Sequence, residues 1–181
     1  KVCLDIGAST GGFTDCLLQR GAKKVYSLDC GQDQLDKSLV NNEKVIVCDN
    51  VNAKNIHKND FSDVDFICMD VSFISATYVI PNISDVLKDN EQAVILIKPQ
   101  FEQDSRLKLK NGVVRDKALQ QKAIKKVIDS ASENGLCVKN VTYSPIKGGK
   151  GNIEYIALFK KNSKSAEIDI KFIVEQANKN L

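Results

Sequence analysis

The chain has 181 residues, of which 43% are hydrophobic and 27% charged, and its formal net charge is +3. This length suits one domain with its own core, and no apolar run approaches the roughly 20 residues that span a bilayer. No signal-peptide pattern opens the chain, so we expect a cytoplasmic protein. The six cysteines contain no CxxC pair and there is one histidine, so we expect no metal site.

Short apolar runs alternate with helical patterns through the first half of the chain. Strands are predicted at Val2–Leu4, Lys24–Leu28, Lys44–Cys48, Val64–Met69 and Gln92–Ile97. Helices are predicted between them at Gly12–Arg20, Gln32–Val40 and Thr77–Leu87. Pro81 predicts that the third of these helices starts or kinks there. Repeated β-α units of this kind indicate an α/β fold with a parallel sheet and helices on both faces.

The pattern changes in the second half of the chain. A long helix is predicted at Lys117–Glu133, followed by two strands at Leu136–Tyr143 and Ile153–Phe159. Two successive strands without a helix between them must pair antiparallel. We therefore predict a mixed seven-stranded sheet, mostly parallel with a late antiparallel strand, as in class I (Rossmann-like) methyltransferases. A C-terminal helix is expected at about residues 165–180.

The domain organisation is simple. No internal repeat or low-complexity segment divides the sequence, so residues 1–181 are expected to form a single domain. The first predicted strand starts at residue 2, and Lys1 is not an initiator methionine. We therefore expect this domain to be part of a longer protein.

A glycine-rich segment, DIGASTGGF, joins the first predicted strand to the first helix. Gly7 allows a tight turn, and Gly11 and Gly12 allow close backbone approach to a ligand. A dinucleotide-binding loop has glycine where this chain has Ser9, and Asp5 would repel a pyrophosphate. S-adenosylmethionine, which is cationic and has no phosphate, fits better. The candidate cofactor contacts here are Asp5, Gly7, Ala8, Ser9, Gly11, Gly12 and Phe13.

Further carboxylates end the next strands at the same edge of the predicted sheet. Asp29 ends the second strand, where it is placed to accept hydrogen bonds from ribose hydroxyls. Asp49 ends the third strand and is expected near the adenine, and Asp70 ends the fourth. Two alternatives stay open for the glycine-rich segment: it binds NAD, or it only caps the first helix.

Asp70 and Lys98 follow two strands that are expected to be neighbours in the sheet. Because parallel strands end at one edge, the carboxylate and the amine should lie close together, where such sheets bind ligands. A lysine partly removed from water can take a proton from a weak nucleophile or stabilise an oxyanion. The alternative is a structural ion pair. Ser72 and Phe73 are candidates for lining a nucleotide pocket, although Phe73 is equally compatible with the core.

Basic residues concentrate between Arg106 and Lys126, a segment that contains eight basic residues and one acidic residue. A basic stretch beside an active-site edge favours a polyanionic partner such as RNA. The alternative is a solvated helix face. The candidate RNA contacts are Arg106, Lys108, Lys110 and Arg115.

Five segments carry a family resemblance. They are DIGASTGGFTD at 5–15, DVSFIS at 70–75, KPQFE at 98–102, NGVVRD at 111–116 and GNIEY at 151–155. In this order they resemble the TlyA (hemolysin A-like) family of FtsJ-type ribosomal RNA 2′-O-methyltransferases, over nearly all of residues 1–160. The resemblance implies S-adenosylmethionine as cofactor and ribosomal RNA or ribosomal subunits as partner.

The family has a Lys-Asp-Lys-Glu catalytic tetrad. Carried over by motif, the resemblance implies that its Asp is Asp70, its second Lys is Lys98 and its Glu is Glu154. The first Lys belongs to an RGG-x-K segment upstream of the first strand, and these 181 residues contain neither that segment nor the family's S4-type RNA-binding domain. The implied chemistry needs no metal.

Three other functions compete with this interpretation. A membrane-active hemolysin is suggested by the family's other name, but the helix at Lys117–Glu133 has no tryptophan for an interfacial apolar face. A cofactor- or RNA-binding module without catalysis is a second alternative. A small-molecule methyltransferase is a third, and it leaves the basic stretch unexplained.

Overall fold

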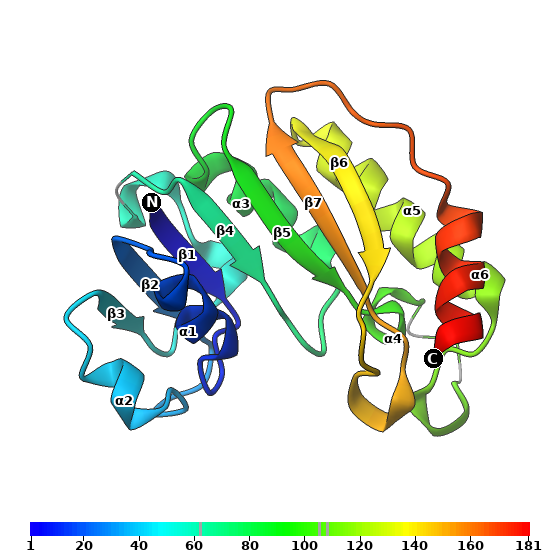
Figure 1. Ribbon diagram of the computed structural model, residues 1–181, viewed down its shortest axis with the longest axis horizontal. Coiled ribbons are helices and arrows are strands. Elements are labelled where there is room, and N and C mark those ends of the chain that lie inside the picture. The colour runs from blue at the N-terminus through cyan, green and yellow to red at the C-terminus, as the bar shows by residue number, and fades with distance from the viewer. Residues whose placement is uncertain (62, 105, 108) are drawn as a thin grey trace.

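A mixed sheet forms the centre of the protein (Figure 1). The computed structural model describes residues 1–61, 63–104, 106–107 and 109–181. Its strands are β1 (Val2–Ile6), β2 (Lys24–Leu28), β3 (Val45–Cys48), β4 (Phe66–Met69), β5 (Gln92–Ile97), β6 (Leu136–Tyr143) and β7 (Tyr155–Lys161). All lie within two residues of the predicted bounds.

The seven described strands are ordered β3-β2-β1-β4-β5-β7-β6. Strands β1 to β5 pair in parallel, whereas β7 runs antiparallel to both β5 and β6. The chain moves outward from β1 to β3 and then returns to the other side of β1 with β4. This reversal places a topological switch point between β1 and β4, where ligands bind in open sheets. The predicted mixed sheet with a late antiparallel strand is confirmed.

Helices cover both faces of the sheet. They are α1 (Gly12–Gln19), α2 (Lys37–Val40), α3 (Ile80–Val86), α4 (Pro99–Glu102), α5 (Lys117–Glu133) and α6 (Ile170–Asn180). Short 3₁₀ turns are η1 (Ala53–Asn55), η2 (Lys58–Asp60), η3 (Ala76–Tyr78), η4 (Lys110–Gly112) and η5 (Gly149–Gly151). In Figure 1, α1 lies in front of β1 and β2, whereas α3 and α5 lie behind the sheet.

Local capping explains where these helices begin. The long helix α5 has its predicted bounds, because the Asp116 side chain accepts a hydrogen bond from the Ala118 N–H and Gly135 follows with a positive φ. The helix predicted at Gln32–Val40 is wrong in its first part. Only α2 forms there, because Asp36 caps it through the Ser38 N–H and the preceding loop contains Asp33 in the left-handed conformation.

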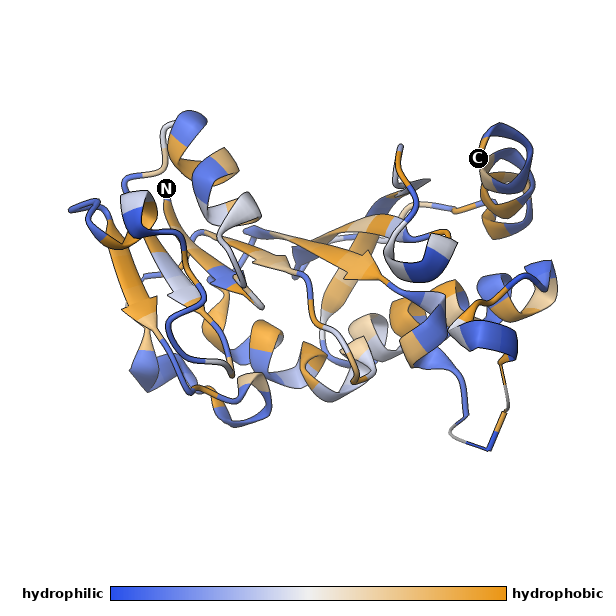
Figure 2. Cartoon of the chain, turned by 90° about the horizontal axis from the view of Figure 1, so that it is seen from below, coloured by the Kyte–Doolittle hydropathy of each residue, from blue (hydrophilic) through white to orange (hydrophobic). Residues whose placement is uncertain are grey.

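The hydrophobic core is built from alternate residues of the strands, which point to the covered face of the sheet. On β5, Ala93, Ile95 and Ile97 are fully buried and pack on the face that α3 and α5 cover. A smaller cluster of Cys3, Val25 and neighbouring residues packs on the α1 side. Figure 2 shows the strands mostly in hydrophobic colours, with hydrophilic segments in the outer loops. This burial holds the carboxyl ends of the parallel strands in a fixed arrangement.

Candidate active site

Asp70 and Lys98 form an ion pair at the carboxyl edge of the sheet. Lys98 Nζ lies 2.5 Å from Asp70 Oδ1 and donates a hydrogen bond to Ser72 Oγ at 2.9 Å. The Lys98 side chain is 12% exposed, so this charge lies largely out of water. The expected proximity of the two groups is confirmed. A partly buried ammonium held by a carboxylate can stabilise negative charge on a substrate oxygen.

The two strands that precede these residues fix their positions. Strands β4 and β5 are neighbours, with Met69 paired to Ile95, so both chains leave the sheet side by side. The Asp70 N–H donates to the Ile6 carbonyl at 2.9 Å, which ties this residue to the end of β1. Lys98 then occupies the N-cap position of α4, and Pro99 is suited to the first helical turn because it lacks an N–H.

Glu102 connects the two loops that carry this pair. Its carboxylate is buried and accepts hydrogen bonds from Ser75 Oγ at 2.5 Å and from the Ala76 N–H at 2.7 Å. Lys126 Nζ lies 3.2 Å from the same carboxylate, so α5 is joined to the cluster. Sequence reasoning assigned Glu102 no role, because nothing in the local pattern distinguishes it from a solvated helix residue.

Glu154 reaches the same edge from β7. Ile97 pairs with Tyr155, so Lys98 and Glu154 stand at the same end of the β5–β7 ladder. The Glu154 carboxylate is buried and accepts a hydrogen bond from Gln100 Nε2 at 3.0 Å. Within the described residues, Lys98 forms its ion pair with Asp70 and not with Glu154. All three residues therefore lie at one edge of the sheet. Among them, Asp70 and Lys98 are in direct contact in the described structure.

The glycine-rich loop packs against this edge. Gly7 has φ +81°, and a Cβ there would lie 2.3 Å from the Asp70 carbonyl oxygen. Gly12 has open space, since a Cβ would meet nothing within 4 Å. Gly11 also makes an internal packing contact, and its predicted contact with a ligand stays a prediction. A Cβ on Gly11 would lie 2.2 Å from Leu39 and 2.7 Å from Leu35, so apolar side chains occupy the space beside it.

Asp5 lies beneath the glycine-rich loop. Its side chain accepts a hydrogen bond from Thr14 Oγ1 at 2.7 Å, and Thr14 also contacts Ser27 Oγ at 2.7 Å. Burial raises the pKa of the Asp5 carboxyl to about 6, against the lowering effect of the Thr14 hydrogen bonds. Through Thr14, Asp5 joins the start of α1 to β1 and β2, and its predicted contact with the cofactor stays a prediction.

Asp29 and Asp49 hold the backbone of the loops around them. Asp29 accepts hydrogen bonds from the Ser9 N–H and the Gly31 N–H, each at 2.8 Å. Asp49 accepts one from the Asp33 N–H at 3.0 Å. Both carboxylates therefore shape the rim beside the glycine-rich loop. Of the other predicted contacts in that loop, Ala8 is buried, Ser9 is exposed and Phe13 is half-buried.

An exposed aromatic side chain stands beside the ion pair. Phe73 is 88% exposed, has φ +65° and packs its ring 5.2 Å from that of Phe101. Lys98 Nζ lies 6.0 Å from the Phe101 ring centroid. A bulky residue rarely adopts a positive φ, so this conformation is strained. The core interpretation of Phe73 is wrong, because its ring lies on the surface.

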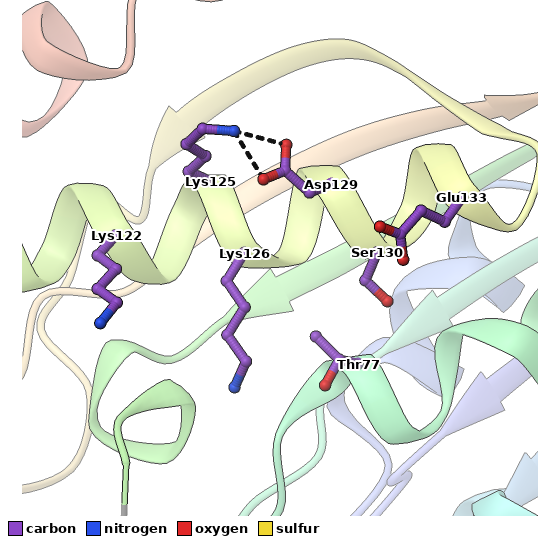
Figure 3. Close-up of a pocket in the computed structure, with 7 residues that line it drawn as sticks. All are labelled: Thr77, Lys122, Lys125, Lys126, Asp129, Ser130 and Glu133. Carbon is purple, nitrogen blue, oxygen red and sulfur yellow. Dashed lines mark hydrogen bonds and ion pairs between the residues drawn. The ribbon is translucent and has the colours of Figure 1, made fainter.

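The predicted RNA contacts lie on the surface near α5. Lys110 and Arg115 are exposed, and the guanidinium of Arg106 donates two hydrogen bonds to Asp104. Lys108 lies outside the described residues. A pocket of about 490 Å³ lies along α5. The side chains that line it are those of Thr77, Lys122, Lys125, Lys126, Asp129, Ser130 and Glu133 (Figure 3). Lys125 points away from Lys122 and Lys126 and pairs with Asp129 at 2.6 Å.

Comparison with known proteins identifies the family. The model of the FtsJ-like methyltransferase family matches residues 1–161. The chain belongs to this family. Hemolysin A of Brachyspira hyodysenteriae is 50% identical over 161 residues, which cover 88% of this chain and 67% of that protein. The 16S/23S rRNA (cytidine-2′-O)-methyltransferase TlyA of Mycobacterium tuberculosis is 40% identical over 154 residues, which cover 84% of this chain.

A solved structure supports the same relationship for this FtsJ-like chain. The structure from Streptococcus thermophilus, described as a candidate hemolysin, superposes with a TM-score of 0.93 at 40% identity and 99% coverage. The chain spans 66% of that protein and 58% of the mycobacterial relative. In the described residues, no helix combines the length and hydropathy that a membrane crossing requires.

Proposed function

We propose that this FtsJ-like domain transfers a methyl group from S-adenosylmethionine to a ribose 2′-hydroxyl of ribosomal RNA. The observation that carries the proposal is the Asp70–Lys98 ion pair, which lies where the glycine-rich loop packs against the sheet edge. Its relative from Mycobacterium tuberculosis is named as an rRNA (cytidine-2′-O)-methyltransferase. With ribosomal RNA as substrate, we also propose that the protein acts in the cytoplasm.

The rim of the glycine-rich loop fits the proposed cofactor. Gly12 leaves open space at the start of α1, and the carboxylates of Asp29 and Asp49 stand at the ends of β2 and β3. Carboxylates accept hydrogen bonds from hydroxyl and amino groups and disfavour a pyrophosphate, so these two suit the nucleoside part of a cofactor without phosphates. When bound, S-adenosylmethionine supplies the electrophilic methyl group. Asp29 and Asp49 would hold its ribose and adenine.

Lys98 activates the substrate hydroxyl in this proposal. Its ammonium, held by Asp70 and Ser72, donates to the ribose oxygen as that oxygen loses its proton, and so stabilises the oxyanion. Glu154 orients the hydroxyl from the β7 side, and its carboxylate accepts the proton that the hydroxyl releases. Proton-transfer assistance of this kind typically contributes about 10²–10⁴-fold, and alignment of the oxygen with the methyl group contributes further.

The surface around the ion pair suits a nucleic acid. The exposed ring of Phe73, supported by Phe101, offers a stacking platform for an unpaired base. Exposed cations such as Lys110, Arg115 and Lys122 lie on the adjoining surface and can contact phosphates. Such contacts position the RNA, whereas contacts to the bases specify the target.

Nucleoside mass spectrometry tests the proposal. Ribosomal RNA incubated with the protein and S-adenosylmethionine should gain a 2′-O-methylated nucleoside. Lys98→Ala should reduce its formation by about 10²–10⁴-fold while calorimetric binding of S-adenosylhomocysteine is retained. Lys88→Ala is the control, because Lys88 is an exposed lysine that pairs with Asp65 elsewhere on the surface. If the protein binds S-adenosylhomocysteine and RNA but forms no modified nucleoside, the proposal is wrong and the domain is a binding module.

A further inference from the structure

The segment after β5 contains an amide side chain, Gln100, in contact with Glu154. Gln100 Nε2 lies 3.0 Å from Glu154 Oε1. The direction of this hydrogen bond is determined chemically, because an ionised carboxylate only accepts hydrogen bonds and the amide nitrogen only donates them. Gln100 follows Lys98 by two residues, so one short segment carries both the proposed activating amine and the partner of Glu154.

Glu154 is confined on its other side by the loop before β7. A Cβ added to Gly148 would lie 2.1 Å from Glu154 Oε1 and 2.2 Å from its Cδ, so the carboxylate packs against bare backbone there. The Ser144 N–H donates to the Glu154 carbonyl at 2.8 Å, which fixes the main chain of the residue. The carboxylate is thus held between Gly148 and the Gln100 amide.

The other end of the Gln100 amide is a second observation. Its Oε1 is buried and accepts no hydrogen bond from any residue that the structure describes. Buried polar atoms in folded proteins nearly always have a partner, and exceptions concentrate at functional sites. Because Nε2 must face Glu154, rotation of the amide cannot satisfy this oxygen without opposing two acceptors.

We propose that Gln100 is a positioning residue that orients Glu154 for methyl transfer, an inference that rests on the proposed function. The amide keeps the carboxylate from rotating away from the edge where Lys98 stands. The effect of Gln100 on the reaction is therefore exerted through Glu154, not through the cofactor.

The test compares Gln100 with a neighbouring glutamine in the full protein. Gln103 follows α4, and among the described residues its amide donates to the backbone carbonyls of Pro99 and Leu119, at 2.9 and 3.3 Å. Gln100→Ala should lower kcat for RNA methylation about tenfold to 10²-fold, with the KM for S-adenosylmethionine changed less than about twofold. Gln103→Ala should change kcat less than about twofold.

The variant Gln100→Glu allows a second test, based on the pH–rate profile. A purely structural role of Gln100 would leave this profile unchanged. It places a second carboxyl group beside Glu154, and two carboxylates at hydrogen-bond distance cannot both be ionised without strong repulsion. The acidic limb of the pH–rate profile should therefore move to higher pH in Gln100→Glu and not in Gln103→Glu. Gln100→Glu keeps the size of the side chain, so it also serves if Gln100→Ala does not fold.

The outcomes separate this inference from the proposed function. A wild-type protein that forms no methylated nucleoside while it binds S-adenosylhomocysteine overturns both. An active wild-type protein whose Gln100 variants match the Gln103 variants in kcat and pH profile overturns the positioning role alone. A loss confined to the KM for S-adenosylmethionine also overturns it, because it would assign Gln100 to cofactor binding.

Discussion

Gly7 and the carbonyl of Asp70 are in such close contact that no side chain fits between them. A Cβ at Gly7 would lie 2.3 Å from the Asp70 oxygen and 2.9 Å from its carbonyl carbon. The glycine-rich loop and the loop that carries the ion pair are therefore packed backbone to backbone. The proposed cofactor site and the proposed catalytic edge are in this way packed together at the switch point between β1 and β4.

Replacement of Gly7 by alanine should disrupt this arrangement. The left-handed φ of +81° and the contact with the Asp70 backbone both oppose a Cβ, so Gly7→Ala should destabilise the fold by about 1–3 kcal/mol. Gly12→Ala is the matched control for stability, because it has open space and a normal φ. It should leave urea unfolding unchanged but weaken binding of S-adenosylhomocysteine. Equal unfolding midpoints for the two variants would contradict this account.

The Asp5 carboxyl should make stability depend on pH. Burial raises its pKa from 3.8 to about 6, so between these values the folded state holds a proton that the unfolded state has released. The free energy of unfolding should therefore rise, by on the order of 3 kcal/mol, as the pH falls through this window. Asp5→Asn should remove that contribution. Urea titrations at several pH values check it, and an identical pH slope in the variant would refute it.

Glu102 should contribute to stability, because it connects the two loops that carry Asp70 and Lys98. Glu102→Ala removes the acceptor of the Ser75 hydroxyl and the Ala76 N–H, and leaving such buried donors unsatisfied costs about 1–3 kcal/mol. Lys126→Ala should cost less than about 1 kcal/mol, because the Lys126 side chain is 41% exposed. Chemical unfolding of both variants measures the difference, which should vanish if the carboxylate is not the centre of the cluster.

Arg115 should contribute to RNA binding through phosphate contacts. Arg115→Ala should weaken binding to unrelated RNA sequences alike and reduce the slope of log K against log salt by about 1. Arg106→Ala should have a smaller effect, because Asp104 already neutralises the Arg106 guanidinium. Filter binding at several salt concentrations gives both slopes. Affinity that does not respond to salt would mean that this basic surface is only solvated.

The local sequence pattern was sufficient to predict the strands, most helices and the two residues of the ion pair. Apolar runs such as Gln92–Ile97 identify buried strands, and the charged residue that follows a parallel strand lies at the ligand-binding edge. Asp70 and Lys98 could therefore be placed together before their contact was known. Gly7 and Gly12 likewise indicated the position of the glycine-rich loop. A glycine allows tight turns and close backbone approach because it has no side chain, which is a property of the residue itself.

Contacts between distant segments were decided only by the tertiary structure. The Gln100–Glu154 hydrogen bond and the Glu102–Ser75 contact join residues 54 and 27 positions apart. Phe73 was compatible with core or surface until its left-handed backbone placed the ring in solvent. Gly11 turned out to face Leu39, which comes from α2. A one-dimensional pattern reports the preference of each segment for burial, whereas the partner of a buried polar group depends on which segments the folded chain brings together.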